Sequence, residues 1–198
     1  RISVGLEEGE SFAGAGNSDA LGGSLGATTY DGAAMTELWD AVYATFYAHS
    51  GYSKASISAG SVTVTNTITG GAGRAQAFGV ITMTGVDQTT PVGTAVTADG
   101  GSAAHSVTVG SVGADDLVVD NLFDEASPTI GADQTLQNTE DVSVQFFRQS
   151  TQPGSAGGVM SWTGNDFEAW GLGAVAFKPA SAGAASPQWP SLTLLGVQ

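Results

Sequence analysis

The sequence has no cysteine and few charged residues, which make up 12% of its 198 positions. Without cysteine the chain can form no disulfide bond and offers no thiol nucleophile or thiolate metal ligand. No apolar run approaches the ~20 residues that cross a bilayer as a helix, so we expect no membrane insertion. Ser, Thr, Gly and Ala stand where charged residues are usual. This composition is typical of β-rich surface proteins and unlike that of helical cytosolic enzymes.

The charges that are present are mostly negative, with five Lys and Arg against nineteen Asp and Glu and a formal net charge of −14. Affinity for nucleic acids depends on cations that neutralise phosphates, so we expect no nucleic-acid partner. The same balance disfavours docking on anionic membranes. Acidity supports solubility at high local concentration, and we predict an extracellular or virion-surface location. Hydrophobic residues reach 41%, enough for a packed core.

Apolar and polar residues alternate at period two through much of the chain, and the segment 61–68 is rich in β-branched residues. Turn residues separate such segments at fairly regular intervals, and Asp31 with Gly32 supplies the positive φ of a tight hairpin. The pattern predicts an all-β fold, a two-sheet antiparallel β-sandwich. The predicted strands cover residues 2–6, 28–30, 61–68, 75–84, 106–112, 116–123, 142–148, 158–163 and 169–178, and residues 7–26 are predicted to form a loop.

The segment 33–49 has two interpretations. Its apolar residues, among them Met35, Leu38 and Val42, sit at helical spacing and fit an amphipathic helix. The preceding Asp-Gly turn favours a returning hairpin strand instead. We expect a strand first, followed by an irregular or briefly helical stretch.

The composition changes after Pro179. Residues 180–188 are rich in Ala, Ser, Gly and Pro and indicate a linker between a β-sandwich domain, 1–179, and a strand-like C-terminal arm, 189–198. The arm either folds back as a last strand of its own domain or pairs with a neighbouring subunit. Its apolar residues are Trp189, Leu192, Leu194, Leu195 and Val197.

Several short motifs occur in order, of which Thr-Gly-Val-Asp-Gln-Thr-Thr-Pro at 84–91 is the most distinctive. With them, residues 1–179 resemble a β-sandwich module that recurs in bacterial secreted proteins and phage structural proteins. The resemblance implies a jelly-roll or concanavalin-like (lectin-like) sandwich and implies no activity. The other matching segments are 29–38, 107–109, 115–120, 160–162 and 170–179.

The sequence departs from that module in one feature, and this departure predicts that copies of the protein assemble with one another. Such modules usually open with an apolar strand ahead of the one that corresponds to 1–6, so we expect a sheet edge that lacks its strand. The segment 191–197 has the length and polarity to fill it. Filling by a neighbouring copy would build a filament. We therefore expect a structural subunit of a virion or an extracellular filament, whose partners are copies of itself or other structural proteins of the same particle.

The motif at 84–91 also has a direct physical interpretation. Gly85 interrupts the strand, Asp87 can accept backbone hydrogen bonds in an Asx-type turn, and Pro91 fixes φ where pairing stops. These residues predict a sheet corner. A calcium ligand at Asp87 is the alternative.

No residue pattern points to catalysis, so we expect no enzyme and no catalytic residue. Gly-Gly-Ser-Leu-Gly at 22–26 lacks the flanking strand and helix of a nucleophile elbow. His49 and His105 belong to no metal-spaced cluster, and His49 is expected at the surface or packed on aromatic rings. Acid pairs such as Asp124 with Glu125 are expected in water at turns, and Asp166 with Glu168 is the least unfavourable catalytic pair. We expect no metal site and no cofactor, with calcium on scattered loop carboxylates as the remaining alternative.

Aromatic residues supply the one candidate binding patch, at Trp39, Tyr43, Tyr47 and Tyr52. Exposed rings stack on sugar faces, so the alternative function is an adhesin-like carbohydrate-binding module with a glycan as its ligand. Core packing is the competing explanation for these rings. Trp162 and Trp170 lie within predicted strands and are expected in the core.

Overall fold

A computed structural model describes residues 2–6, 9–17, 24–43, 47–57, 60–69, 76–142 and 145–180. Strands β1 to β16 and one short 3-10 helix, η1 (Gly154–Ala156), make up the regular structure of these residues. Every pairing between the described strands is antiparallel. The all-β sandwich class is thereby confirmed, although the described strands form four sheets and not two. The jelly-roll type stays a prediction.

Strands β1 to β8 form two of these sheets. The N-terminal outer sheet has the order β1-β7-β3-β4, and the N-terminal inner sheet has the order β5-β6-β2-β8. The outer strands are β1 (Ile2–Leu6), β7 (Gly60–Thr69), β3 (Ser24–Tyr30) and β4 (Ala33–Ala34), and the inner strands are β5 (Thr36–Tyr43), β6 (Tyr47–Ile57), β2 (Gly9–Asn17) and β8 (Gln76–Met83).

Strands β9 to β16 form the other two sheets. The C-terminal inner sheet has the order β13-β14-β11-β16-β9, and the C-terminal outer sheet has the order β10-β15-β12. The inner strands are β13 (Thr135–Val142), β14 (Gln145–Pro153), β11 (Leu117–Asp124), β16 (Trp170–Phe177) and β9 (Val96–Gly100), and the outer strands are β10 (Ala104–Thr108), β15 (Val159–Thr163) and β12 (Thr129–Ile130).

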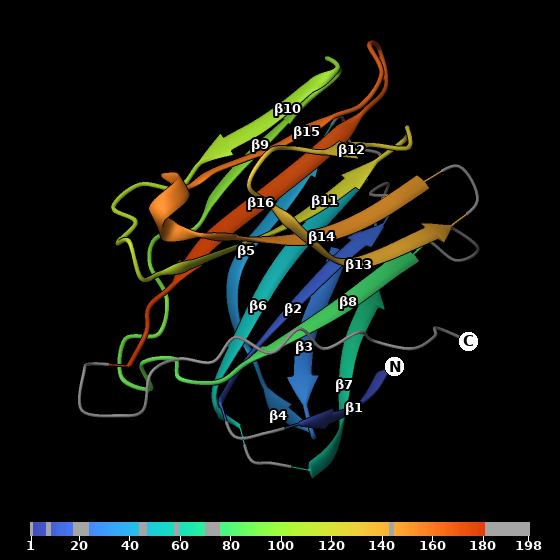
Figure 1. Cartoon of the computed structure of the whole chain (residues 1–198). Helices are drawn as coiled ribbons and strands as arrows, with labels where there is room; N and C mark the ends of the chain where they lie inside the picture. The colour runs from blue at the N-terminus through green and yellow to red at the C-terminus, as the bar shows by residue number, and fades with distance from the viewer. Residues whose placement is uncertain are drawn as a thin grey trace.

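The four sheets are stacked, with the two inner sheets against each other (Figure 1). Apolar clusters fill the three spaces between them: one lies in each outer space, and two, of which the smaller holds Ala77, Phe123 and Phe147, lie between the inner sheets. Tyr52 and Val64 belong to the cluster between the N-terminal sheets, and Met160 and Leu172 to the cluster between the C-terminal sheets. Phe12 and Phe177 belong to the larger cluster between the inner sheets. The two halves therefore share one continuous stack.

The two halves have the same strand order. In the outer sheets β1-β7-β3 corresponds to β10-β15-β12, and in the inner sheets β5-β6-β2-β8 corresponds to β13-β14-β11-β16. Taken along the chain, these seven strands follow one another in the same sequence in both halves. Only β4 in the first half and β9 in the second have no counterpart among the described strands.

The shared order extends to the residues that face the cores. Val64 of β7 pairs with Ile2, and Trp162 of the corresponding β15 pairs with His105. Val64 and Trp162 are both buried between their own outer and inner sheets. Likewise Phe-Gly-Val at 78–80 in β8 and Trp-Gly-Leu at 170–172 in β16 match in residue type and in the side that each residue faces. The chain is built as two copies of one seven-stranded plan.

The central strands of the inner sheets are covered on both faces, and one of them, β2, was predicted as a loop. All eight residues of β16 are buried, and β2 consists largely of Gly and Ala. A strand covered on both sides shows no alternation of polar and apolar residues. The predicted loop at 7–26 was therefore wrong over Gly9–Asn17, which is β2 and pairs with both β6 and β8.

In the described part of 33–49 the strand expected first is confirmed, whereas the helical interpretation and the irregular stretch expected after the strand were wrong. Thr36–Tyr43 is strand β5, and Tyr47–Ile57 is strand β6, which pairs with it. Apolar residues recur at helical spacing here because β5 has a register shift between Glu37 and Trp39. The bulge breaks the period of two in the sequence. The strand predicted at 142–148 in fact spans the end of β13 and the start of β14.

Candidate functional site

The predicted aromatic patch is not an exposed surface at the two positions whose side chains are described. Trp39 is 7% exposed and Tyr52 is 1% exposed. Trp39 joins the cluster between the inner sheets, and Tyr52 packs between the N-terminal sheets with its hydroxyl donating to Gly26 O (3.0 Å). Core packing is thus the correct explanation for both. The side chains of Tyr43 and Tyr47 lie outside the described residues.

Trp39 and His49 form the polar centre of the interface between the inner sheets. Trp39 Nε1 donates a hydrogen bond to His49 Nδ1 (3.2 Å), and its ring lies 5.7 Å from that of Phe12. Burial lowers the pKa of His49 to about 4, so the ring is neutral at pH 7. The expectation of an aromatic-packed histidine is confirmed, and a surface position is excluded because His49 is 2% exposed.

The motif at 84–91 forms the corner that its residues predict. Gly85 has φ +71°, and Asp87 Oδ1 accepts hydrogen bonds from the backbone N–H groups of Thr89 (2.7 Å) and Thr90 (3.1 Å). These bonds, chiefly that from Thr89, lower the pKa of Asp87. Pro91 O accepts a hydrogen bond from Lys178 N (2.8 Å). The corner therefore ties the connection between the halves to the end of β16.

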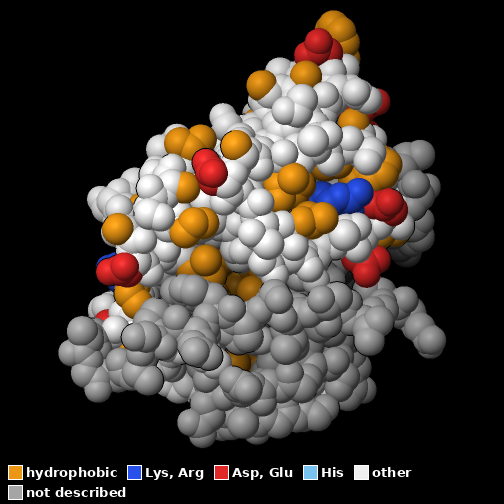
Figure 2. Space-filling view, viewed as in Figure 1, with side chains coloured by type: hydrophobic (Ala, Val, Ile, Leu, Met, Phe, Trp, Pro, Cys, Tyr) orange, Lys and Arg blue, Asp and Glu red, His pale blue; other side chains and the backbone are white. Residues whose placement is uncertain are grey.

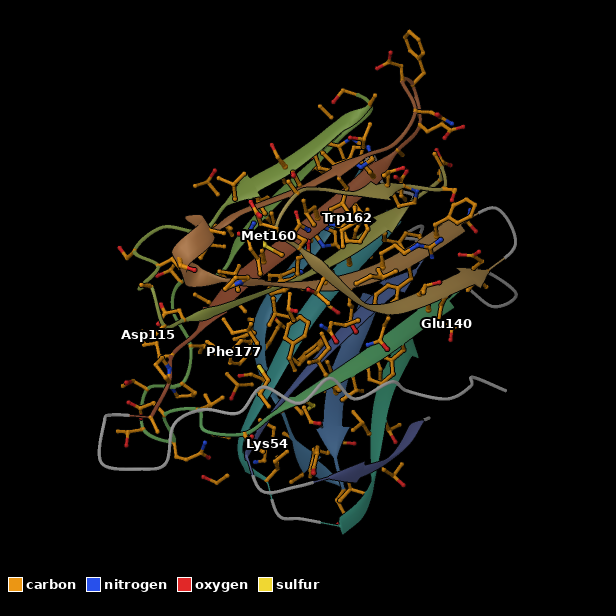
Figure 3. All side chains as sticks on the ribbon, viewed as in Figure 1. Lys54, Asp115, Glu140, Met160, Trp162 and Phe177 are labelled. Carbon is orange, nitrogen blue, oxygen red and sulfur yellow. The ribbon has the colours of Figure 1, made fainter. Side chains whose placement is uncertain are left out.

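Asp120 is a fully buried carboxylate that clamps the C-terminal outer sheet to the inner sheet. Oδ1 accepts hydrogen bonds from Ser150 N (2.7 Å) and Ser150 Oγ (2.8 Å), and Oδ2 accepts one from Trp162 Nε1 (2.7 Å). Burial raises its pKa to about 7, and the hydrogen bonds from Trp162 and Ser150 oppose that rise. Figure 3 shows Trp162 between these sheets. We did not anticipate this residue, because an Asp between Val119 and Asn121 gives no sequence signal of burial.

A second buried polar pair lies at one end of the same interface. His105 Nδ1 is 3.4 Å from Asp124 Oδ2, and the His105 ring stacks on Trp170 with centroids 4.6 Å apart. Burial lowers the pKa of His105 to about 4 and raises that of Asp124 to about 6. The expectation that Asp124 is a solvated turn residue was wrong, because β11 continues through Asp124 and carries it into the core. Neither group is exposed to a substrate.

The least unfavourable catalytic pair lies on a surface loop. Asp166 Oδ1 accepts a hydrogen bond from Ala103 N (3.0 Å), and Glu168 Oε2 accepts one from Asn165 Nδ2 (3.5 Å). Both carboxylates therefore brace the loop on which they lie. No group of three or more His, Cys, Asp or Glu side chains suited to a metal ion occurs within the described ranges. The helical content of those ranges also includes no segment long and apolar enough to cross a membrane.

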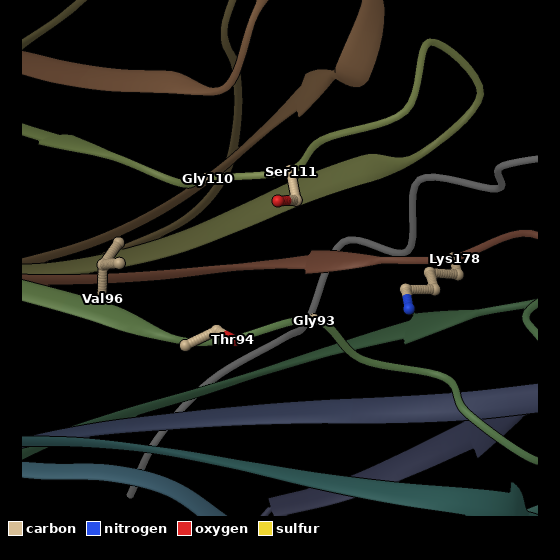
Figure 4. A pocket seen from close by; sticks show the side chains of 6 residues that line it. All are labelled: Gly93, Thr94, Val96, Gly110, Ser111 and Lys178. Atoms are coloured by element: carbon tan, nitrogen blue, oxygen red, sulfur yellow. The ribbon is translucent and has the colours of Figure 1, made fainter.

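A shallow pocket of about 340 Å³ lies where the inter-half connection passes the loop after β10 (Figure 4). Lys178 is its one charged lining residue, and Thr94 and Ser111 supply hydroxyl groups. The lining includes no carboxylate or imidazole that could serve as an acid or base. The remaining lining residues are Gly93, Val96 and Gly110.

Phe167 is the most exposed large hydrophobic residue that the structure describes, at 97%. It lies between Asp166 and Glu168 in the loop that joins β15 to β16. This loop projects from the end of the molecule in Figure 1, where Figure 2 shows hydrophobic and acidic side chains together. Sequence reasoning did not single out Phe167 as a candidate binding residue. An aromatic residue within the polar run Asn-Asp-Phe-Glu was the available signal.

The predicted assembly arm lies outside the described residues, as does the linker beyond Ala180. Its residues are Trp189, Leu192, Leu194, Leu195 and Val197. The described chain reaches Ala180, whose N–H donates to Gly85 O (2.8 Å). The point where the C-terminal segment begins therefore lies beside Gly85, which follows the end of β8 by two residues in the sequence.

No family model, no curated protein and no solved structure matches this chain.

Proposed function

We propose that this protein is a non-enzymatic structural subunit of a virion or an extracellular filament, joined to its neighbours by exchange of a β-strand. The observation that carries the proposal is the difference between the two halves at one sheet edge. In the C-terminal inner sheet, β9 lies outside β16 and pairs with it from Trp170 to Ala174. In the N-terminal inner sheet, β8 corresponds to β16 and is the last described strand of the sheet.

An edge strand of this kind is suited to strand addition. Backbone N–H and C=O groups that lack a ladder partner are a ready template for another strand. One carbonyl on β8 has a side-chain partner, since Asn138 Nδ2 of β13 donates to Val80 O (3.3 Å). An added strand would replace that single side-chain bond with a ladder of backbone bonds. β8 is therefore the acceptor edge in this proposal.

The donor in this proposal is the segment 191–197 of a neighbouring copy. Its run Ser-Leu-Thr-Leu-Leu-Gly-Val has the length and apolar content of a strand. The C-terminal segment starts beside Gly85, at the C-terminal end of β8, which is the end from which an antiparallel strand would begin. Ten residues, 181–190, separate this point from the donor segment and give it the reach to pair with another copy.

Paired cysteines test the exchange directly, because the protein has no cysteine of its own. Chains with Thr82→Cys on β8 are mixed with chains that carry one cysteine at a position from 191 to 195, under mild oxidation. We expect disulfide-linked dimers at alternate arm positions, because successive residues of a strand face opposite sides. Thr129→Cys, on edge strand β12 of the C-terminal outer sheet, is the matched acceptor control and should give no such pattern.

A chain that carries both cysteines distinguishes exchange from closure within one molecule. Under exchange, dilution should reduce the yield of disulfide, which links different chains. A disulfide that forms within single chains at every dilution would contradict the proposal and show that the arm completes its own sheet. For the alternative carbohydrate-binding function no specific observation remains, since Trp39 and Tyr52 are buried.

A further inference from the structure

The loop that carries Phe167 is held in place by its backbone. Gly164 N donates to Ala103 O (2.9 Å), and Phe167 N donates to Gly101 O (2.8 Å). From the other side, Ala103 N donates to Asp166 Oδ1 (3.0 Å). The loop between β15 and β16 is thus bonded through Gly164, Asp166 and Phe167 to the loop between β9 and β10. This bracing holds the backbone that carries the aromatic ring.

The side chain of Phe167 contributes nothing to the packing of the core. Its side chain is 97% exposed, and its backbone has φ +73°, in the left-handed region that bulky residues rarely adopt. Glycine would relieve the strain with no loss of buried surface. A strained residue with no role in the core is a reason to look for a role in recognition.

The charged residues around Phe167 are acidic and indicate a partner with basic side chains. Asp166 and Glu168 flank it in the chain, and Glu125 is attached to the same loop by the bond from Ala169 N to its Oε2 (2.9 Å). None of the five Lys and Arg of the sequence lies in either loop. With a net charge of −14, the whole molecule also attracts cations over a longer range. The tip therefore combines one apolar anchor with an anionic rim.

We infer that the loop 164–169 is a docking tip for a basic protein surface that offers an apolar socket to Phe167. The ring would be buried as the central anchor, and the carboxylates would face Lys or Arg side chains at the rim. A sugar is a poorer fit, because the described tip has a single ring and its carboxylate oxygens already accept hydrogen bonds from Ala103 and Ala169. A second copy of this acidic chain is disfavoured by charge at this tip.

The inference can be tested with fluorescent model peptides and the full chain. A Lys/Leu peptide supplies both cationic and apolar groups, a Lys/Ser peptide supplies charge alone, and a Glu/Leu peptide reverses the charge. We expect the Lys/Leu peptide to bind most tightly and Phe167→Ser to weaken it about ten-fold, to the level of the Lys/Ser peptide. Glu168→Gln should weaken binding and reduce its dependence on salt. Val159→Ser, at a hydrophobic residue 45% exposed on β15, is the matched control and should change nothing.

Three results would overturn the inference. Equal binding of the Glu/Leu peptide would remove the role of charge, and unchanged Lys/Leu binding by Phe167→Ser would remove the role of the ring. Binding of a neutral oligosaccharide that is lost with Phe167→Ser, without peptide binding, would identify a glycan site instead. Phe167→Gly separates recognition from folding: we expect its thermal midpoint to equal or exceed that of the parent, and a lower midpoint would show that Phe167 supports the fold.

Discussion

At the level of single residues, burial decides the protonation state of His49. Its ring is enclosed between the two inner sheets, and desolvation lowers its pKa from 6.5 to about 4. An unfolded chain binds a proton at this residue below about pH 6.5, whereas the folded chain does so only near pH 4. The stability that His49 contributes is therefore complete above pH 6.5 and is lost as the pH falls toward 4.

Replacing His49 should flatten part of the pH dependence of stability. In His49→Gln the amide oxygen can still accept the hydrogen bond from Trp39 Nε1, but no group titrates at this position. Between pH 7 and pH 4.5 we expect the free energy of unfolding to decrease by about 2–3 kcal/mol less in the variant than in the parent. Urea unfolding at both pH values measures this. Parallel pH profiles would show that His49 is not held neutral in the folded state.

Residue chemistry alone predicted only part of the candidate sites. The Asx turn at Asp87 could be derived because its partners, Thr89 and Thr90, are neighbours in the sequence. The clamp at Asp120 could not, because its partners come from β14 and β15, distant in sequence. Trp39 and Tyr52 were ambiguous for a similar reason, since aromatic residues serve both binding and packing and only the tertiary fold separates the two.

At the level of strands, small residues allow the inner sheets to approach each other. A Cβ at Gly171 of β16 would lie 2.5 Å from His49 Cδ2, and one at Gly79 of β8 would lie 2.9 Å from Phe147 Cε1. Real Cβ atoms do not approach other atoms so closely, so the larger side chains fit only because these positions are glycine. Each of the two glycines sits in the strand that occupies the same place in its half.

Filling one of these positions should loosen the central interface. We expect Gly171→Ala to reduce the free energy of unfolding by about 1–3 kcal/mol, because the methyl group forces the His49 ring or the sheet to shift. Gly110→Ala is the matched control: no atom lies within 4 Å of the place its methyl group would take, and the change should be close to neutral. Chemical denaturation of both variants measures the difference. Equal stability of the two would contradict close contact between the inner sheets.

The success of strand prediction follows the residue types of each strand. The segments 61–68 and 158–163 lie in outer strands β7 and β15, where one face is covered and alternation is clear. β2 and β6 were missed or misassigned because both of their faces are covered and they contain many small residues. β9 was missed as well, because its sequence Val-Thr-Ala-Asp-Gly has only small or polar residues after Val96 and ends in a dipeptide typical of turns. The predictions 75–84, 116–123 and 169–178 match inner strands β8, β11 and β16, which contain large apolar residues. Small residues therefore hide a strand more effectively than its position in an inner layer does.

At the level of the whole molecule, the repeated strand order accounts for the stacking of the two halves and for the contacts between their inner sheets, and it exposes the difference at the edge of β8. The halves stack through corresponding sheets: β5 contacts β16 and β9 of the facing sheet, and β13 contacts β8 of the facing sheet. Among the described strands, the position outside β8 is the one place where the two halves differ in an inner sheet. Strand exchange at this edge would complete the first half in the way that β9 completes the second.

Electron microscopy of the purified full chain, with light scattering on the same sample, tests this account most directly. We expect regular polymers from the parent chain, and their loss in a variant that lacks residues 189–198, because the acceptor edge then has no donor strand. Uniform particles of 19.8 kDa in the parent sample, at concentrations where the variant behaves identically, would contradict strand exchange as the means of assembly.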